Sequence, residues 1–187
     1  AVNARLAADL AVREVARAPE GWNPRFVKGW KRYRYQIWNA PTASPLRARR
    51  FAHEPRRLDL GAMRRAAEDL QGTHDFAAFQ GRGSSVTCTT RTLFELRVEG
   101  EAGGEVRIEA RGDGFLKHMV RTLVGTLVEV GHGSRPPDSM PALLATHDRT
   151  RAGRTAPARG LVLVEVQVPL EASPGREPTS APEGSPA

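Results

Sequence analysis

The sequence has one cysteine, Cys88, among its 187 residues. One cysteine cannot form a disulfide within the chain or supply the paired thiolates of a cysteine metal cluster. Long uncharged apolar runs are also missing, so no stretch could cross a bilayer as a helix. The first residues lack a basic segment followed by an apolar one, which is the pattern of a secretory signal peptide. We therefore expect a cytoplasmic protein that does not enter a membrane.

Lysine is also scarce, so the basic character of the chain comes almost entirely from arginine. Lysine and arginine together number 28 against 21 acidic residues, which gives a formal net charge of +7. An excess of this sign favours polyanionic partners, because each neutralised phosphate releases bound counterions. A coding bias towards arginine, alanine and glycine would produce the same composition without any nucleic-acid partner.

Apolar residues alternate with polar ones along several short stretches. Residues 31–38 place Tyr33 and Tyr35 on one face and Arg32 and Arg34 on the other, which predicts a half-buried strand with a basic outer face. Similar patterns predict further strands at 9–15, 91–99, 105–111 and 161–168, with a glycine-rich turn between the second and third of these.

Helical spacing appears in three places. Asp59 is a suitable N-cap for a helix that runs to about Gln71 and stops at Gly72. Apolar residues recur at helical intervals from 115 to 130, ahead of Gly131 and Gly133, and a shorter helix is expected at 140–146. Strands joined by hairpin turns and mixed with helices predict an α+β fold with a mixed, largely antiparallel sheet on which the helices pack. Residues 171–187 contain no large apolar side chain that could contribute to a core, so we expect a disordered tail there.

Six stretches, in this order and spacing, carry a family resemblance. They are KRYRY at 31–35, HDFAAF at 74–79, FLKHMVR at 115–121, LVEVG at 127–131, DRT at 148–150 and TAPARGL at 155–161. Together they resemble the bacterial tRNA pseudouridine synthase A family. The resemblance implies a cofactor-free isomerase that converts uridine to pseudouridine in the anticodon stem-loop of tRNA. It also implies a homodimer whose two-lobed subunits hold the active site in a cleft between the lobes.

The same resemblance implies a division of the chain. Residues 1–25 would be a remnant of an incomplete N-terminal lobe, and residues 26–160 would form the C-terminal lobe. Residues 161–170 would be a strand that returns to the N-terminal lobe, and the tail would follow at 171–187. The family's catalytic aspartate lies in a Gly-Arg-Thr-Asp motif that does not occur here; Gly-Arg-Thr-Ala at 153–156 has Ala156 where the carboxylate should be. We therefore expect these residues to be a fragment of a longer enzyme and to be inactive alone.

The resemblance also assigns the remaining site residues. Arg121 matches the arginine that pairs with the catalytic aspartate, Tyr33 matches the active-site tyrosine that lies against the base, and Leu161 matches a leucine that closes the pocket. Arg32 and Arg34 are candidates to bind substrate phosphates. From periodicity alone, each of these five has an ordinary structural interpretation as a surface arginine or a core side chain.

Two other functions stay open from the residues alone. A chain without the aspartate could act as a non-catalytic RNA-binding module, or as a basic structural domain of unrelated ancestry. No pair of the five histidines has the helical spacing of metal ligands, so we expect no metal site. Asp75 and Asp113 lie near expected turns and are interpreted as caps rather than catalysts.

Overall fold

The computed structural model describes residues 2–23 and 29–169, which fall into two units. One unit is formed by Ala1–Lys28 with Val168–Ala187, and the other by Gly29–Gln167. The strands of the second unit are β1 (Trp30–Trp38), β2 (Ala52–His53), β3 (Gly72–Asp75), β4 (Thr90–Gly100), β5 (Glu105–Gly112) and β6 (Leu161–Gln167). Its α-helices are α1 (Leu60–Glu68), α2 (Met119–Gly131) and α3 (Met140–Thr146), and its 3₁₀ turns are η2 (Ala77–Phe79), η3 (Pro137–Ser139) and η4 (Ala158–Gly160).

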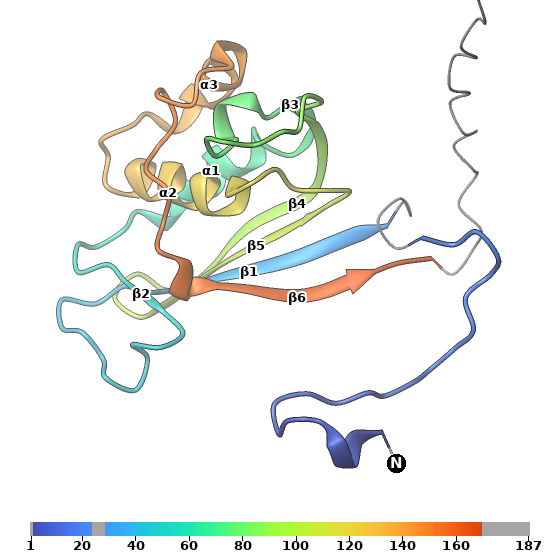
Figure 1. Ribbon diagram of the computed structural model, residues 1–187. Helices are drawn as coiled ribbons and strands as arrows, with labels where there is room; N and C mark the ends of the chain where they lie inside the picture. The colour runs from blue at the N-terminus through green and yellow to red at the C-terminus, as the bar shows by residue number, and fades with distance from the viewer. Residues whose placement is uncertain (1, 24–28, 170–187) are drawn as a thin grey trace, which may run out of the picture. The chain divides into compact units, whose positions relative to one another are not determined.

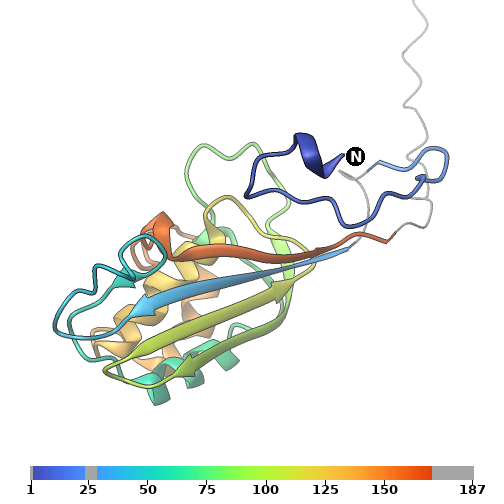
Figure 2. The ribbon, with the colours of Figure 1, turned by 90° about the horizontal axis from the view of Figure 1, so that it is seen from below.

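The six strands form one mixed, largely antiparallel sheet. Its order is β2-β1-β5-β4-β3, and β6 pairs with the same side of β1 as β2 does but further towards its start. Only the short β1–β2 pairing is parallel among these strands. The α-helices lie on one face of this sheet (Figure 1), and the view from below shows the strands in front of them (Figure 2). The α+β class expected from the sequence is confirmed.

The core lies between the sheet and its helices. Tyr35 and Ile37 of β1 project into it, as does Ile108 of β5, and all three are at most 1% exposed. α2 is the central helix, with eleven of its thirteen residues buried. A helix that is apolar on nearly all sides has to be enclosed, and this explains why α1 and the sheet both pack against α2.

Several expected elements are confirmed with shifted ends. Asp59 caps α1 by accepting a hydrogen bond from the Ala62 amide at 2.9 Å, but the helix ends at Glu68. Gly72 is not its stop; with a positive φ of 97°, it begins β3. α2 begins at Met119 rather than at 115, because His118 has a left-handed backbone (φ 58°) that a continuous right-handed helix cannot contain. The strands β2 and β3 were not predicted, since they are too short to show a pattern.

The predicted strand at 9–15 is wrong. In the first unit, η1 (Asn3–Arg5) is followed by irregular chain, and the Asn3 side chain forms hydrogen bonds of 2.8 Å with both the amide and the carbonyl of Val12. A side chain therefore satisfies backbone groups that a neighbouring strand would otherwise satisfy. Trp22 Nε1 also donates to the Pro169 carbonyl within this unit at 3.0 Å.

Two other expectations fall on residues that the structure does not describe. The tail at 171–187 lies outside the described residues, and so does the proposed domain boundary at residue 26. In the part of the chain that is described, no helix is long and apolar enough to cross a membrane.

Candidate functional site

Tyr33 and Leu161 lie close together on the face of the sheet that carries the helices. Leu161 pairs with Tyr35 in the β1–β6 register, two residues along β1 from Tyr33, so side-chain alternation places all three on one face. The Tyr33 ring packs edge-to-face against Phe115, with centroids 5.1 Å apart and planes at 84°. Partial burial raises the pKa of the Tyr33 hydroxyl, which therefore stays protonated at neutral pH.

Arg121 is half-buried in the first turn of α2 and is attached to a loop that precedes β6. Its Nε donates to the Ala156 carbonyl at 2.6 Å, and the Ala156 amide donates to the Arg121 carbonyl at 3.0 Å. No carboxylate in the described part of the chain forms an ion pair with Arg121. The guanidinium is thus held by one edge and carries a positive charge that the described residues do not neutralise.

The next carbonyl along this loop holds a second side chain. Tyr35 donates its hydroxyl hydrogen to the Pro157 carbonyl at 2.7 Å. Burial raises the pKa of Tyr35 to about 12, although the positive charges of Arg121, Arg159 and Arg154 oppose the increase. Three arginines therefore lie near one buried hydroxyl.

Two glycines allow this loop to lie directly on α2. A Cβ on Gly125 would overlap the Arg154 carbonyl oxygen, and a Cβ on Gly153 would lie 2.6 Å from the Thr126 amide nitrogen. The Gly153 amide donates to Thr126 Oγ1 at 2.9 Å. Gly-Arg-Thr-Ala at 153–156 therefore supplies backbone positions that hold Arg121, and not a carboxylate.

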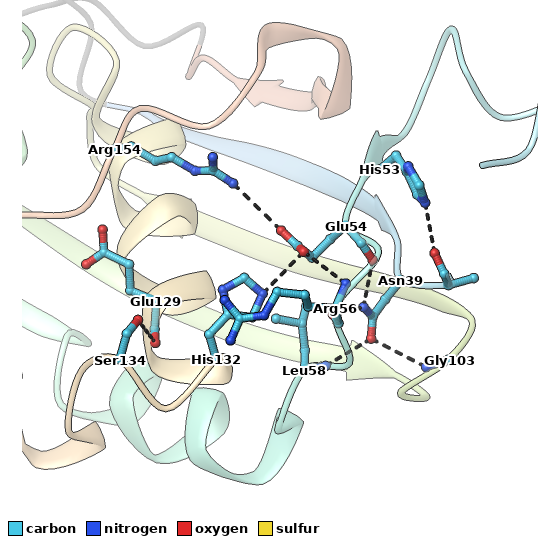
Figure 3. Close-up of polar contacts among 11 residues, drawn as sticks. Asn39, His53, Glu54, Arg56, Leu58, Gly103, Glu129, His132, Ser134 and Arg154 are labelled. Atoms are coloured by element: carbon cyan, nitrogen blue, oxygen red, sulfur yellow. Dashed lines mark hydrogen bonds and ion pairs between the residues drawn. The ribbon is translucent and has the colours of Figure 1, made fainter. Parts of the chain in front are cut away.

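A buried carboxylate supports the other side of the loop. Glu54 is 8% exposed, and its two oxygens lie 3.3 Å from His132 Nε2 and 3.7 Å from Arg154 Nη2 (Figure 3). Asn39 fixes the segment that follows Glu54 by donating to the Glu54 and Arg56 carbonyls at 2.9 and 2.7 Å. Glu54 thus links the chain after β2 and the end of α2 to the loop that anchors Arg121.

Arg32 and Arg34 lie on the other face of the sheet, away from Tyr33, Leu161 and Arg121. Arg34 forms an ion pair with Glu109, its neighbour across the strands. Arg32 lies over the Trp30 ring at 5.6 Å from its centroid. The structure therefore places three of the five expected site residues on the side of the sheet that carries the helices, and a phosphate-binding role for the other two stays a prediction.

The aspartates expected to cap turns do so. Asp75 accepts hydrogen bonds from the Ala77 amide at 2.9 Å and the Thr89 hydroxyl at 2.5 Å, and the Thr89 bond is the main cause of a lowered Asp75 pKa. Asp113 accepts one from the Thr92 amide at 2.9 Å. Within residues 2–23 and 29–169, no three His, Cys, Asp or Glu side chains are grouped so that they could hold a metal ion.

Sequence reasoning missed the part that backbone atoms and Tyr35 have in this site. Tyr35 was expected only to share a strand face with Tyr33, and the residue types do not identify the Ala156 and Pro157 carbonyls as hydrogen-bond acceptors. The available signal was the presence of Gly125 in the middle of a helical pattern, since such a glycine often marks a close packing contact.

Comparison with known proteins identifies the family of this chain. A family model described as tRNA pseudouridine synthase matches residues 66–169. Relatives named tRNA pseudouridine synthase A are 47% identical in Syntrophotalea carbinolica, 45% in Geotalea uraniireducens and 45% in Myxococcus xanthus, in each case over 165 residues and 88% of this chain. The matched part spans 65%, 67% and 62% of these three relatives, so the chain corresponds to about two thirds of their length. The chain belongs to the tRNA pseudouridine synthase family.

Proposed function

We propose that this chain supplies one wall of the uridine site of a tRNA pseudouridine synthase. The substrate is a uridine in the anticodon stem-loop of tRNA, and the product is pseudouridine. The observation that carries the proposal is Arg121, a half-buried cation fixed through Nε to a backbone carbonyl and unpaired with any carboxylate of the described residues. Such a group is prepared to receive an anion on its remaining N–H donors.

The reaction requires a carboxylate beside the sugar of the target uridine. The bond from N1 to C1′ breaks, the base turns, C5 bonds to C1′, and the C5 proton is replaced by a proton on N1. No atoms are gained or lost, so the protein has only to hold the base and direct the carboxylate. Arg121 keeps that carboxylate ionised and oriented through a charge-assisted hydrogen bond, because a neighbouring cation lowers a carboxyl pKa.

Tyr33 and Leu161 hold the base. The Tyr33 ring is fixed edge-on by Phe115, so its free face and its protonated hydroxyl are available to a flipped uracil. Leu161, at the start of β6, closes the same side with an apolar surface that excludes water.

The sequence of these 187 residues contains no Gly-Arg-Thr-Asp motif, so the carboxylate has to come from elsewhere. We expect no pseudouridine from the isolated chain. We expect activity when the chain is joined to a preceding segment that carries the Gly-Arg-Thr-Asp motif of the family. The assay measures the release of tritium from tRNA whose uridines carry tritium at C5.

Arg121 provides the decisive variant. In the joined protein, Arg121→Gln should lower kcat at least a hundredfold, because the carboxylate loses a charged partner worth roughly 3 kcal/mol. Arg97→Gln removes the same charge from the opposite face of the sheet and should leave turnover unchanged. Equal turnover by the two variants would contradict the assignment of Arg121, and turnover by the isolated chain would contradict the need for an external carboxylate.

Homodimerisation and a cytoplasmic location stay predictions. Sedimentation equilibrium of the joined protein tests the first directly.

A further inference from the structure

A basic pocket lies next to the loop that anchors Arg121. Its volume is about 410 Å³, and its charged or polar lining includes Arg82, His118, Arg149, Arg154 and Thr155. No aspartate or glutamate lines it. Arg154 reaches Glu54, but the distance is 3.7 Å and its side chain is 72% exposed, so its charge is only weakly compensated.

Arg149 is held in this pocket by neutral partners. Its Nη2 donates to Thr155 Oγ1 at 2.9 Å and its Nη1 to the Ala152 carbonyl at 3.5 Å. These bonds use two of the five guanidinium N–H donors, and no carboxylate of the described residues pairs with Arg149. The adjacent Asp148 is turned towards Thr150, whose amide and hydroxyl both donate to it at 2.8 Å. The guanidinium is therefore oriented without being neutralised.

Arg82 reaches the pocket from a loop that Lys117 holds in place. The Gly81 amide donates to the Lys117 carbonyl at 2.7 Å, and Lys117 Nζ donates to the Arg82 carbonyl at 3.0 Å. A Cβ on Gly81 would lie 2.9 Å from His118 Nδ1, so the loop packs directly on the start of α2. The Arg82 side chain is exposed and has no ion pair within the described residues.

We propose that this pocket binds a backbone phosphate of the RNA substrate, close to the target uridine. Arginine forks match phosphate oxygens in pairs, and the Thr155 hydroxyl adds a further polar contact. The loop that lines the pocket at 153–155 continues directly into Ala156, which holds Arg121. A phosphate bound here would fix the ribose beside the Arg121 guanidinium. The identification of the polyanion as substrate RNA rests on the proposed function.

The test measures RNA binding by the 187-residue chain at several salt concentrations, with a fluorescent uridine-containing RNA hairpin and anisotropy as the signal. Arg149→Gln and Arg82→Gln are compared with Arg97→Gln, which removes the same charge from a strand on the opposite face of the sheet. The Arg149 side chain forms two hydrogen bonds that could matter for folding. The Arg82 side chain forms none within the described residues, so Arg82→Gln should not affect folding. Thermal unfolding verifies that each variant is folded.

We expect each pocket variant to weaken binding about tenfold at low salt, as for a lost charge-assisted hydrogen bond. Each should also reduce the slope of log K against log salt by about 0.7 to 0.9, and Arg97→Gln should change neither quantity. Equal effects of all three variants would mean diffuse attraction and would overturn the proposal, as would the absence of RNA binding by the wild-type chain. The proposal would also be overturned if inorganic phosphate displaced the RNA equally well from the wild-type chain and from all three variants.

Turnover is measured separately on the joined protein. A protein that makes no pseudouridine but shows the expected salt slopes refutes the catalytic proposal and leaves the phosphate site supported. Normal turnover and RNA binding in both pocket variants would refute the phosphate site and leave the catalytic proposal intact.

Discussion

Gly125→Ala tests whether the site depends on the close approach of a loop to α2. Gly125 lies in the middle of this helix, where alanine is intrinsically better than glycine by about 1 kcal/mol. Helix propensity alone therefore predicts a more stable protein. The packing predicts the opposite, because the new methyl group would overlap the Arg154 carbonyl oxygen and lie 2.9 Å from the carbonyl carbon.

The overlap is with backbone rather than with the end of a flexible side chain, so the loop itself has to move. Inserting a methyl group into a well-packed region costs about 1–3 kcal/mol, and a rigid neighbour brings the cost towards the upper end. After the gain in propensity is subtracted, we expect Gly125→Ala to lower the free energy of unfolding by about 1–2 kcal/mol. The displaced loop includes Ala156, so the hydrogen bond from Arg121 Nε should also weaken.

Urea denaturation at neutral pH measures the first effect, and the NMR signal of the Arg121 Nε–H group measures the second. Gly61→Ala in α1 is the matched control, because its Cβ would be 3.2 Å from Asp59 Oδ1 and 3.8 Å from Arg65 Nη1, both at side-chain ends. It should be close to neutral or slightly stabilising. If Gly125→Ala stabilises the protein by about 1 kcal/mol and leaves the Arg121 signal unchanged, the close approach is not real.

Two further predictions concern pH. Because the Tyr35 pKa is raised in the folded state, the native protein holds its proton more tightly, and stability should fall by about 2–3 kcal/mol as pH rises from about 10 to about 12. Tyr35→Phe should remove this decline, and at neutral pH it should cost about 1–2 kcal/mol by leaving the Pro157 carbonyl without its donor; an unchanged alkaline limb in urea titrations would refute this. The Asp75 pKa is lowered, so its contribution to stability is present above the usual aspartate pKa and is lost as pH falls below about 4. Asp75→Asn should reduce the loss of unfolding free energy at acidic pH. If the variant loses as much stability as the wild type in this range, the Thr89 bond does not contribute to it.

Much of the fold followed from the sequence because its long elements have clear periodicity. Tyr33 and Tyr35 alternate with basic residues, and the apolar stripe of α2 could be recognised within one or two turns of its true ends. The start of α2 could not be placed, because histidine has no strong preference for the left-handed backbone that His118 adopts where the Gly81 loop packs against it. The predicted strand at 9–15 failed because alternation does not supply the partner that a strand requires.

The site was only half visible in the sequence for a related reason. Arg121, Tyr33 and Leu161 were predicted as site residues from their matches to family motifs, and side-chain alternation required Tyr33 to face away from Arg32 and Arg34. The anchors of Arg121 and Tyr35 are carbonyl groups, which every residue has. Such a contact cannot be predicted from residue types, and the only sequence feature that indicates it is the glycines that allow the close approach.

Charged side chains on the sheet face away from the helices lie mostly beside side chains of opposite charge. On this face, the strand registers place most charges beside opposite ones, although Arg32 lies opposite Arg111. The charged side chains are Arg32, Arg34, Arg97, Arg107 and Arg111, and Glu95, Glu99, Glu105, Glu109 and Glu165. Cross-strand pairs of this kind neutralise one another, and Glu109 is already buried beside its partner. These ten side chains carry equal numbers of positive and negative charges, and they include Arg32 and Arg34, which the sequence suggested for phosphate binding. In the loops beside α2, Arg82 and Arg149 have no ion pair with the described residues and line a pocket without acids. Compared with the ten paired side chains of this face, Arg82 and Arg149 should therefore attract a polyanion more strongly.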